Sequence, residues 1–187
     1  LPFFLAGCNT FEKIFSPLIN RGLFNVANAY LTAERELIYF ERGKIKEHGH
    51  VIDESHPYYQ SLIDTRDRFI DLYGAAETAQ FKHDINQYNS DVLDYLYEAG
   101  YKSEHEIIAM RALNPFYIPM YAEPDQDAGK VYNLDESGNI KGLESFDPVT
   151  AIRDINLDDR VDIEPPFETM MHNTHRAIKA AQSNLQH

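Results

Sequence analysis

The sequence has one cysteine, no long apolar run and few basic residues, and each shortage excludes a class of structure or argues against a class of partner. With Cys8 as the sole cysteine of 187 residues, neither an internal disulfide nor a zinc site built from cysteines can form. No stretch approaches the roughly 18 consecutive apolar residues of a membrane-spanning helix. The 17 Lys and Arg residues are outnumbered by 30 Asp and Glu residues. The resulting net charge of −13 argues against binding to nucleic acid, whose phosphates would be repelled.

The residues that are abundant indicate an ordinary globular core. Hydrophobic residues make up 43% of the chain, which is enough for one domain, or for one domain with an appendage. The chain has twelve tyrosines and eleven phenylalanines. Tyrosine is amphipathic and favours half-buried surfaces and interfaces, so we expect most of these tyrosines at the rim of the core.

The lone cysteine ends a short apolar run at the start of the sequence. Leu1 to Leu5 is followed by the small residues Ala6 and Gly7, then by Cys8 and a polar Asn9-Thr10 pair. Among these side chains only a thiol can carry a diacylglyceryl group as a thioether. The pattern Leu5-Ala6-Gly7-Cys8 resembles the lipobox of bacterial lipoproteins, in which a signal peptide is cut just before the cysteine. The alternative is a buried N-terminal segment with a buried free thiol.

The resemblance implies a location in the cell. Residues 1–7 would be the remainder of a signal peptide, and a lipid such as palmitate on Cys8 would anchor the protein to a membrane leaflet that faces the periplasm or the exterior. Several acyl chains hold a protein stably without a membrane-spanning helix. Asn9, in place of aspartate after the cysteine, resembles an outer-membrane address. We therefore expect an envelope protein anchored in the outer membrane and facing the periplasm.

Helix signals dominate the region from residue 16 to residue 114. Ser16-Pro17 predicts a helix start, and apolar residues at spacings of three and four continue to about Lys46. Pro57 begins a second apolar helical face that extends to Glu98. This face forms either one long helix or, as we prefer, two helices with a break at Asn89-Ser90-Asp91.

A capping box opens the next helix. Ser103 and Glu106 have the spacing of this motif, and the helix should end before Asn114-Pro115. The resulting helical segments predict an antiparallel bundle over residues 16–114, joined to the anchor by a linker over residues 8–15.

The remainder of the chain has a different character. Residues 115–166 should be rich in loops, with a small hairpin over 130–143, a short helix from Asp147 through Ile155, and an acidic linker over 156–166. A C-terminal helix within 167–187 carries a thin apolar stripe, as a peripheral or partner-binding helix would. The predicted fold is therefore mainly α: an antiparallel helical bundle with a small β-hairpin excursion and a C-terminal helix.

Three histidines are candidate metal ligands. His48, His50 and His56 lie among the carboxylates of Glu47, Asp53 and Glu54, and imidazole with carboxylate suits zinc, iron or copper. Glu47 and His50 have the spacing of ligands in di-iron bundles, but the pattern occurs once and lies at a predicted helix end. The alternative is a solvated polar connection between helices.

Motifs for enzymatic catalysis are missing from the sequence. It has no Gly-x-Ser-x-Gly elbow and no glycine-rich phosphate loop, so an enzyme, such as a hydrolase with an unrecognised site, is the minority interpretation. The leading hypothesis is a non-enzymatic envelope lipoprotein that binds another envelope protein as an accessory or scaffold, with Phe116, Tyr117 and Tyr121 as candidate partner-binding residues. The competing hypothesis is a periplasmic lipoprotein that binds a divalent metal or a small ligand, through the histidines or through an aromatic pocket around residues 116–121. Apart from the covalent lipid and this metal, no cofactor is implied.

Overall fold

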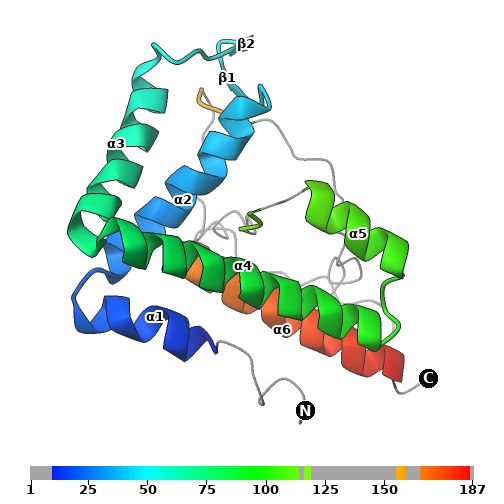
Figure 1. The fold of residues 1–187 in the computed structure, drawn as a ribbon. Coiled ribbons are helices and arrows are strands. Elements are labelled where there is room, and N and C mark those ends of the chain that lie inside the picture. Colours follow the sequence, from blue (N-terminus) through cyan, green and yellow to red (C-terminus); the bar gives the residue numbers. More distant parts are fainter. Residues whose placement is uncertain (1–9, 114–115, 119–154, 159–164, 186–187) are drawn as a thin grey trace, which may run out of the picture.

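The computed structural model describes residues 10–113, 116–118, 155–158 and 165–185, and it confirms a mainly helical fold with a small β excursion (Figure 1). Cys8, Tyr121 and the hairpin predicted over 130–143 lie outside these residues. No helix among the described residues is long and apolar enough to span a bilayer. The elements within the described ranges are α1 (Phe11–Asn20), α2 (Phe24–Glu41), β1 (Ile45–Glu47), β2 (His50–Val51), α3 (Pro57–Tyr73), α4 (Ala75–Glu98), α5 (Glu104–Leu113), β3 (Ile155–Asn156) and α6 (Pro166–Leu185).

The first predicted helix is in fact two helices. Thr10, which was expected in a linker, is the N-cap of α1, and its side chain accepts a hydrogen bond from the backbone N–H of Lys13 at 3.4 Å. Pro17 lies inside α1 rather than at a helix start. The chain then turns at Gly22, where φ is +68°, before α2 begins. The apolar spacing continues across this turn, so periodicity alone does not reveal it.

The break between α3 and α4 is also displaced from its predicted position. It occurs at Gly74, where φ is +105°, whereas Asn89, Ser90 and Asp91 lie within the uninterrupted helix α4. Gln87 donates a hydrogen bond to the Asp91 carboxylate at 2.8 Å, so Asp91 interacts along the helix surface instead of capping a new helix. The start of α3 at Pro57 is confirmed.

A three-stranded sheet forms where the long first helix was expected to continue. Helix α2 ends at Glu41, Gly43 follows with φ +63°, and β1 then occupies the centre of the sheet. Strand β2 pairs with β1 in antiparallel orientation, and β3 pairs with it in parallel, with Ile45 opposite Ile155. The prediction that Ile155 is helical was therefore wrong, because its backbone joins the sheet edge instead.

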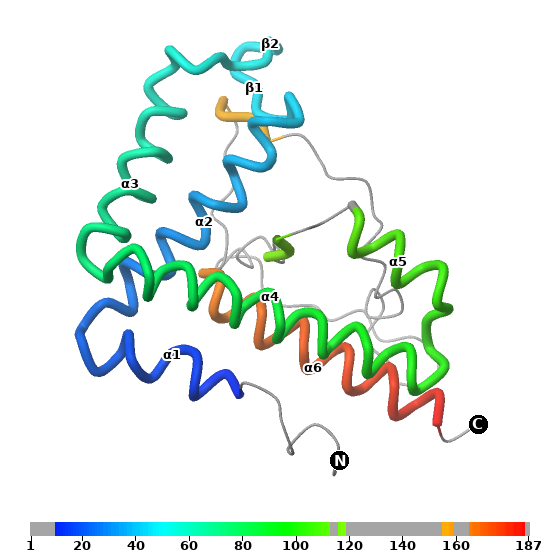
Figure 2. Tube along the Cα trace, viewed as in Figure 1, coloured from blue at the N-terminus to red at the C-terminus, as the bar shows by residue number. Residues whose placement is uncertain are grey.

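The helices surround two separate apolar clusters. Figure 2 shows α2 and α3 as an antiparallel pair, α4 turning away from α3, α6 alongside α4, and α1 on the far side from the sheet. The aromatic cluster joins α1, α2, α3, α4 and α6 through the rings of Phe11, Phe15, Phe24, Tyr30, Phe69, Phe81, Tyr88 and Phe167. The hairpin cluster contains Ile45 and Ile155 of the sheet together with Ala33, Ile52 and Leu62.

The packing of helix α6 explains why its apolar stripe is thin in the sequence. Its inward face uses small side chains, Thr169, Ala177 and Ala181, which are buried together with Met170 and Asn173. Its first turn is fixed to α2, because the backbone N–H of Phe167 donates to the side-chain oxygen of Asn28 at 3.0 Å. Small residues allow α6 to approach its neighbours closely, so a narrow stripe is enough to pack the helix into the domain.

Candidate functional site

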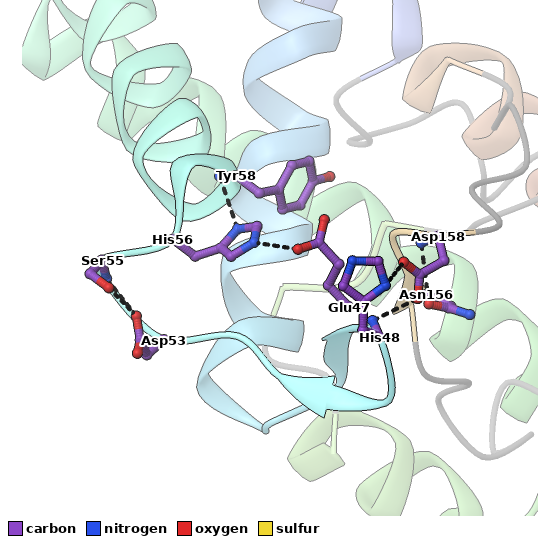
Figure 3. Close-up of polar contacts among 8 residues, drawn as sticks. All are labelled: Glu47, His48, Asp53, Ser55, His56, Tyr58, Asn156 and Asp158. Atoms are coloured by element: carbon purple, nitrogen blue, oxygen red, sulfur yellow. Dashed lines mark hydrogen bonds and ion pairs between the residues drawn. The ribbon is translucent and has the colours of Figure 1, made fainter.

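The turn between β1 and β2 places His48 against the end of β3. His48 has φ of +50° and Gly49 has φ of +78°, so the turn uses two consecutive left-handed residues. The backbone N–H of His48 donates to Oδ2 of Asp158 at 2.6 Å, and its Nδ1 lies 2.8 Å from Oδ1 of the same carboxylate (Figure 3). Asp158 therefore holds both the backbone and the imidazole of His48, which links the turn to the segment just after β3, 110 residues further along the chain.

His56 caps helix α3 with its imidazole. Its Nδ1 accepts a hydrogen bond from the backbone N–H of Tyr58 at 3.2 Å, and its Nε2 lies 3.0 Å from Oε2 of Glu47. Since Nδ1 accepts, the hydrogen of the neutral ring is assigned to Nε2, which donates to Glu47. The same side chain thus satisfies an unpaired N–H at the start of α3 and connects that helix to β1.

The structure does not bring the three candidate histidines together. Figure 3 shows His48 directed at Asp158 and His56 directed at Glu47. The third candidate, His50, is exposed on β2. Within the part of the chain that the structure describes, no group of three His, Cys, Asp or Glu side chains is arranged to hold a metal ion. The arrangement is instead two separate imidazole–carboxylate pairs at one end of the domain.

A buried polar cluster next to this turn was not anticipated. Arg35 and Glu36 are both buried near the middle of α2, with Nη2 of Arg35 3.8 Å from Oε1 of Glu36. The hydroxyl of Tyr58 donates to Oε2 of Glu36 from the first turn of α3. Burial raises the pKa of the nearby Tyr39 hydroxyl, against the opposing effect of Arg35. The signal in the sequence was a run of three consecutive charged residues, 34–36, between two mostly apolar stretches; because successive helical residues are about 100° apart, such a run cannot lie entirely on the solvent side.

Glu34, which directly precedes Arg35 in α2, takes part in a second polar contact. It pairs with Lys82 of α4, whose ammonium also lies 4.9 Å from the centre of the Phe116 ring. Burial, reinforced by the carboxylate of Glu34, raises the pKa of Tyr30 above its usual range. Together with the Glu36–Tyr58 bond, these contacts tie α2 to both α3 and α4.

Two of the three candidate partner-binding residues contribute to the interior of the domain. Phe116 is buried and belongs to the same core as the aromatic cluster. Tyr117 is half-buried, and its backbone carbonyl accepts a hydrogen bond from Asn89 Nδ2 at 2.6 Å. Phe116 is therefore engaged by Lys82 and the core, and is not presented on the surface.

Large apolar side chains are exposed around the connection between α4 and α5 instead. Tyr97 is 46% exposed, Ile108 57% and Leu185 65%, and we call these three residues the end patch. Asn184 donates to the carbonyl of Ala99 at 2.7 Å, which fixes the end of α6 beside this connection. The end patch therefore takes one residue from each of α4, α5 and α6, whose ends meet at this connection.

The helix that carries Ile108 is firmly positioned. The capping box predicted for α5 is present: the N–H of Ser103 donates to Glu106 at 2.8 Å, and the N–H of Glu106 donates to Ser103 Oγ at 3.3 Å. Arg111 holds the other end of α5 against α4, with Nη2 2.7 Å from the Asp94 carboxylate. These contacts present Ile108 on a fixed helix and not on a loop.

Comparison with protein-family models gives no match, and neither curated proteins nor solved structures show a significant similarity to the chain.

Proposed function

We propose that this chain is a lipid-anchored protein of the bacterial cell envelope, facing the periplasm from the outer membrane, which binds another envelope protein as a non-enzymatic accessory or scaffold. The observation that carries the proposal is the Leu5-Ala6-Gly7-Cys8 pattern, which ends two residues before Thr10, the cap of the first helix. A lipid on Cys8 would thus be attached almost directly to the folded domain.

The end patch supports the second half of the proposal, that the domain binds a protein. Large apolar residues that are exposed in the same region of a surface mark interaction sites more often than scattered ones do. Tyr97, Ile108 and Leu185 are exposed on three helices whose ends meet at the α4–α5 connection, and aromatic side chains are enriched in protein interfaces. The end patch is therefore the surface that we assign to the partner protein.

Substitution of Cys8 tests the anchor. The unaltered protein should fractionate with membranes and carry the mass of several acyl chains, whereas Cys8→Ser should be recovered in the soluble fraction. Because Cys8 precedes the described domain, the variant should keep the same circular dichroism spectrum. A Cys8→Ser protein that stays membrane-bound would contradict the anchor.

Photo-crosslinking tests the partner surface. A photoreactive amino acid in place of Ile108 should give one discrete crosslinked protein in intact cells. The matched control is Val51 on β2, which is 54% exposed and belongs to the opposite region of the domain. Crosslinking from Val51 but not from Ile108 would move the partner to the hairpin, and crosslinking from neither position would contradict the scaffold role.

A second candidate function is metal or small-ligand binding at the hairpin, favoured by the two imidazole–carboxylate pairs. Carboxylates commonly orient zinc-bound histidines, so the pairs could be rearranged by an ion. Added zinc should then raise the unfolding temperature of the unaltered protein, and the gain should vanish in His48→Ala and His56→Ala but persist in His83→Ala, whose histidine is exposed on α4. An unchanged unfolding temperature with zinc would exclude zinc binding that stabilises this fold.

A further inference from the structure

The geometry around α1 points to a membrane-facing surface, and this inference rests on the lipid anchor proposed above. We propose that α1 lies along the lipid leaflet, together with the C-terminal end of α3, and that the β1–β2 hairpin is directed away from the membrane. The partner of this surface is the headgroup layer of the leaflet that holds the lipid on Cys8.

The short connection to the anchor fixes one end of α1. Phe11, the first residue of α1, follows Cys8 by three positions. An extended chain spans at most about 3.6 Å per residue, so the Cα atoms of Cys8 and Phe11 can be no more than about 11 Å apart. The polar headgroup layer on each side of a bilayer is itself roughly 5–8 Å thick. The first turn of α1 must therefore lie close to the headgroups.

Exposed apolar side chains mark the other end of α1. Ile19 is 55% exposed, and Leu72, near the end of α3, is 45% exposed. Arg21 joins the two segments, because its guanidinium donates to the backbone carbonyls of Leu72 at 3.1 Å and Tyr73 at 3.3 Å. Apolar side chains of this kind can enter the boundary between headgroups and acyl chains. A helix held by the anchor at one end and by these side chains at the other would lie along the leaflet.

The charge distribution is compatible with this orientation. Residues 1–33 carry one acidic side chain, Glu12, and two basic ones, Lys13 and Arg21. Residues 1–33 thus have a net charge of +1, and the residues beyond 33, with 15 basic and 29 acidic side chains, carry −14. Anionic headgroups would repel most of this protein, but they would not repel the segment that follows the anchor.

The direction of α2 places the hairpin far from the leaflet. Figure 1 shows α2 running from the end of α1 to the hairpin, with α1 and the sheet at opposite ends of the molecule. The 18 residues of α2 span about 27 Å at 1.5 Å per residue. With α1 on the membrane, the His48–Asp158 and His56–Glu47 pairs would face the aqueous compartment.

Site-directed labelling can test the orientation in the intact lipidated protein. Because Cys8 would be blocked by its lipid, a cysteine introduced at Glu12, Asn20 or Val51 would be the only free thiol. All three positions are exposed, at the start of α1, at its end and on the hairpin. Each protein would carry a fluorophore and be reconstituted into vesicles of phosphatidylethanolamine and phosphatidylglycerol that contain a headgroup-spin-labelled lipid.

The outcomes separate this inference from the proposed function. Quenching several-fold stronger at Glu12→Cys and Asn20→Cys than at Val51→Cys would establish that α1 lies along the leaflet. Vesicle-bound protein in which Asn20→Cys is quenched no more than Val51→Cys would overturn the orientation while leaving the anchor intact. Protein that does not bind vesicles at all would overturn the orientation and the lipid anchor together.

Discussion

At the α1 end of the molecule the buried side chains that meet are mostly aromatic rings, whereas at the hairpin end the fully buried side chains are aliphatic and are bordered by charged groups. Phe15 alone has ring contacts with Phe11, Phe24, Phe81 and Phe167, at centroid distances of 4.9 to 6.2 Å. The hairpin cluster has five buried members, and next to it lie the buried side chains of Arg35 and Glu36.

This difference should make the two ends respond to different conditions. Packing of apolar rings depends on shape and burial, and it is insensitive to pH and salt over a wide range. Charged and hydrogen-bonded contacts depend on protonation and, where exposed, on ionic strength. The aromatic end should therefore supply most of the free energy of unfolding. The polar contacts should determine how often elements such as the β1–β2 turn and the start of α5 open locally.

Truncation of Phe15 should have the largest effect. Phe15→Ala removes a buried ring from the centre of the aromatic cluster, and such substitutions cost about 3–5 kcal/mol of unfolding free energy. Phe40→Ala is the matched control, because Phe40 is only half-buried and its ring contacts that of Tyr59 at the hairpin end. Urea unfolding measures both variants. An equal loss in the two would show that the aromatic cluster does not dominate stability.

Removal of the Tyr58 hydroxyl should have the next largest effect. Tyr58→Phe takes one donor from the buried Glu36 carboxylate, and loss of such a bond costs about 1–3 kcal/mol. Tyr97→Phe controls for the substitution itself, since Tyr97 is exposed in the end patch and its hydroxyl should contribute little. If the two variants unfold at the same urea concentration, the buried contact adds no stability.

The capping box of α5 should make the start of that helix sensitive to acid. Hydrogen bonds from Ser103, aided by Lys102, lower the pKa of Glu106 from 4.5 to about 2. A pKa that is lower in the folded state contributes stability that is present above about pH 4.5 and is lost as the pH falls toward about 2. Amide-exchange protection of α5, corrected for intrinsic rates, should fall over this range and become less pH-dependent in Glu106→Gln. Glu104→Gln should retain the dependence.

Weakening the contact between His48 and the Asp158 carboxylate should have the smallest effect on stability. Asp158→Asn weakens a contact in which the imidazole is largely exposed, and exposed pairs contribute about 0–1 kcal/mol. The effect should shrink further in high salt. Asp67→Asn, which breaks a pair with the adjacent Arg66, controls for loss of a carboxylate. If Asp158→Asn lowered the free energy of unfolding as much as Tyr58→Phe, the His48–Asp158 contact would be a major source of stability.

Local signals identified those elements whose ends are encoded in a few neighbouring residues. Pro57 marked the start of α3, and the Ser103–Glu106 capping box marked the start of α5, because in each case the deciding contact lies within three residues. The C-terminal helix, expected within 167–187, was also found, and it extends from Pro166 to Leu185. The mainly helical fold follows from such signals.

The remaining features depend on contacts that a linear pattern does not reveal. Gly22 and Gly74 interrupt apolar periodicities that continue on both sides, so the glycine conformations, and not the spacing, determine the breaks. Strand β3 has two residues and exists only because β1 lies beside it. In the candidate site, the density of histidines was visible, but their separate carboxylate partners, Glu47 and Asp158, depend on the three-dimensional path of the chain.

The position of Phe167 in the chain has a consequence for synthesis of the protein. Its ring meets Phe11, Phe15 and Phe24, and its backbone N–H bonds to Asn28, 139 residues earlier. A chain emerging from the ribosome therefore makes these N-terminal rings first and the ring that covers them last. Until α6 is complete, the nascent protein has an open apolar surface that a chaperone could bind. Truncation before Phe167 should thus leave a product that is recognised as unfolded and degraded.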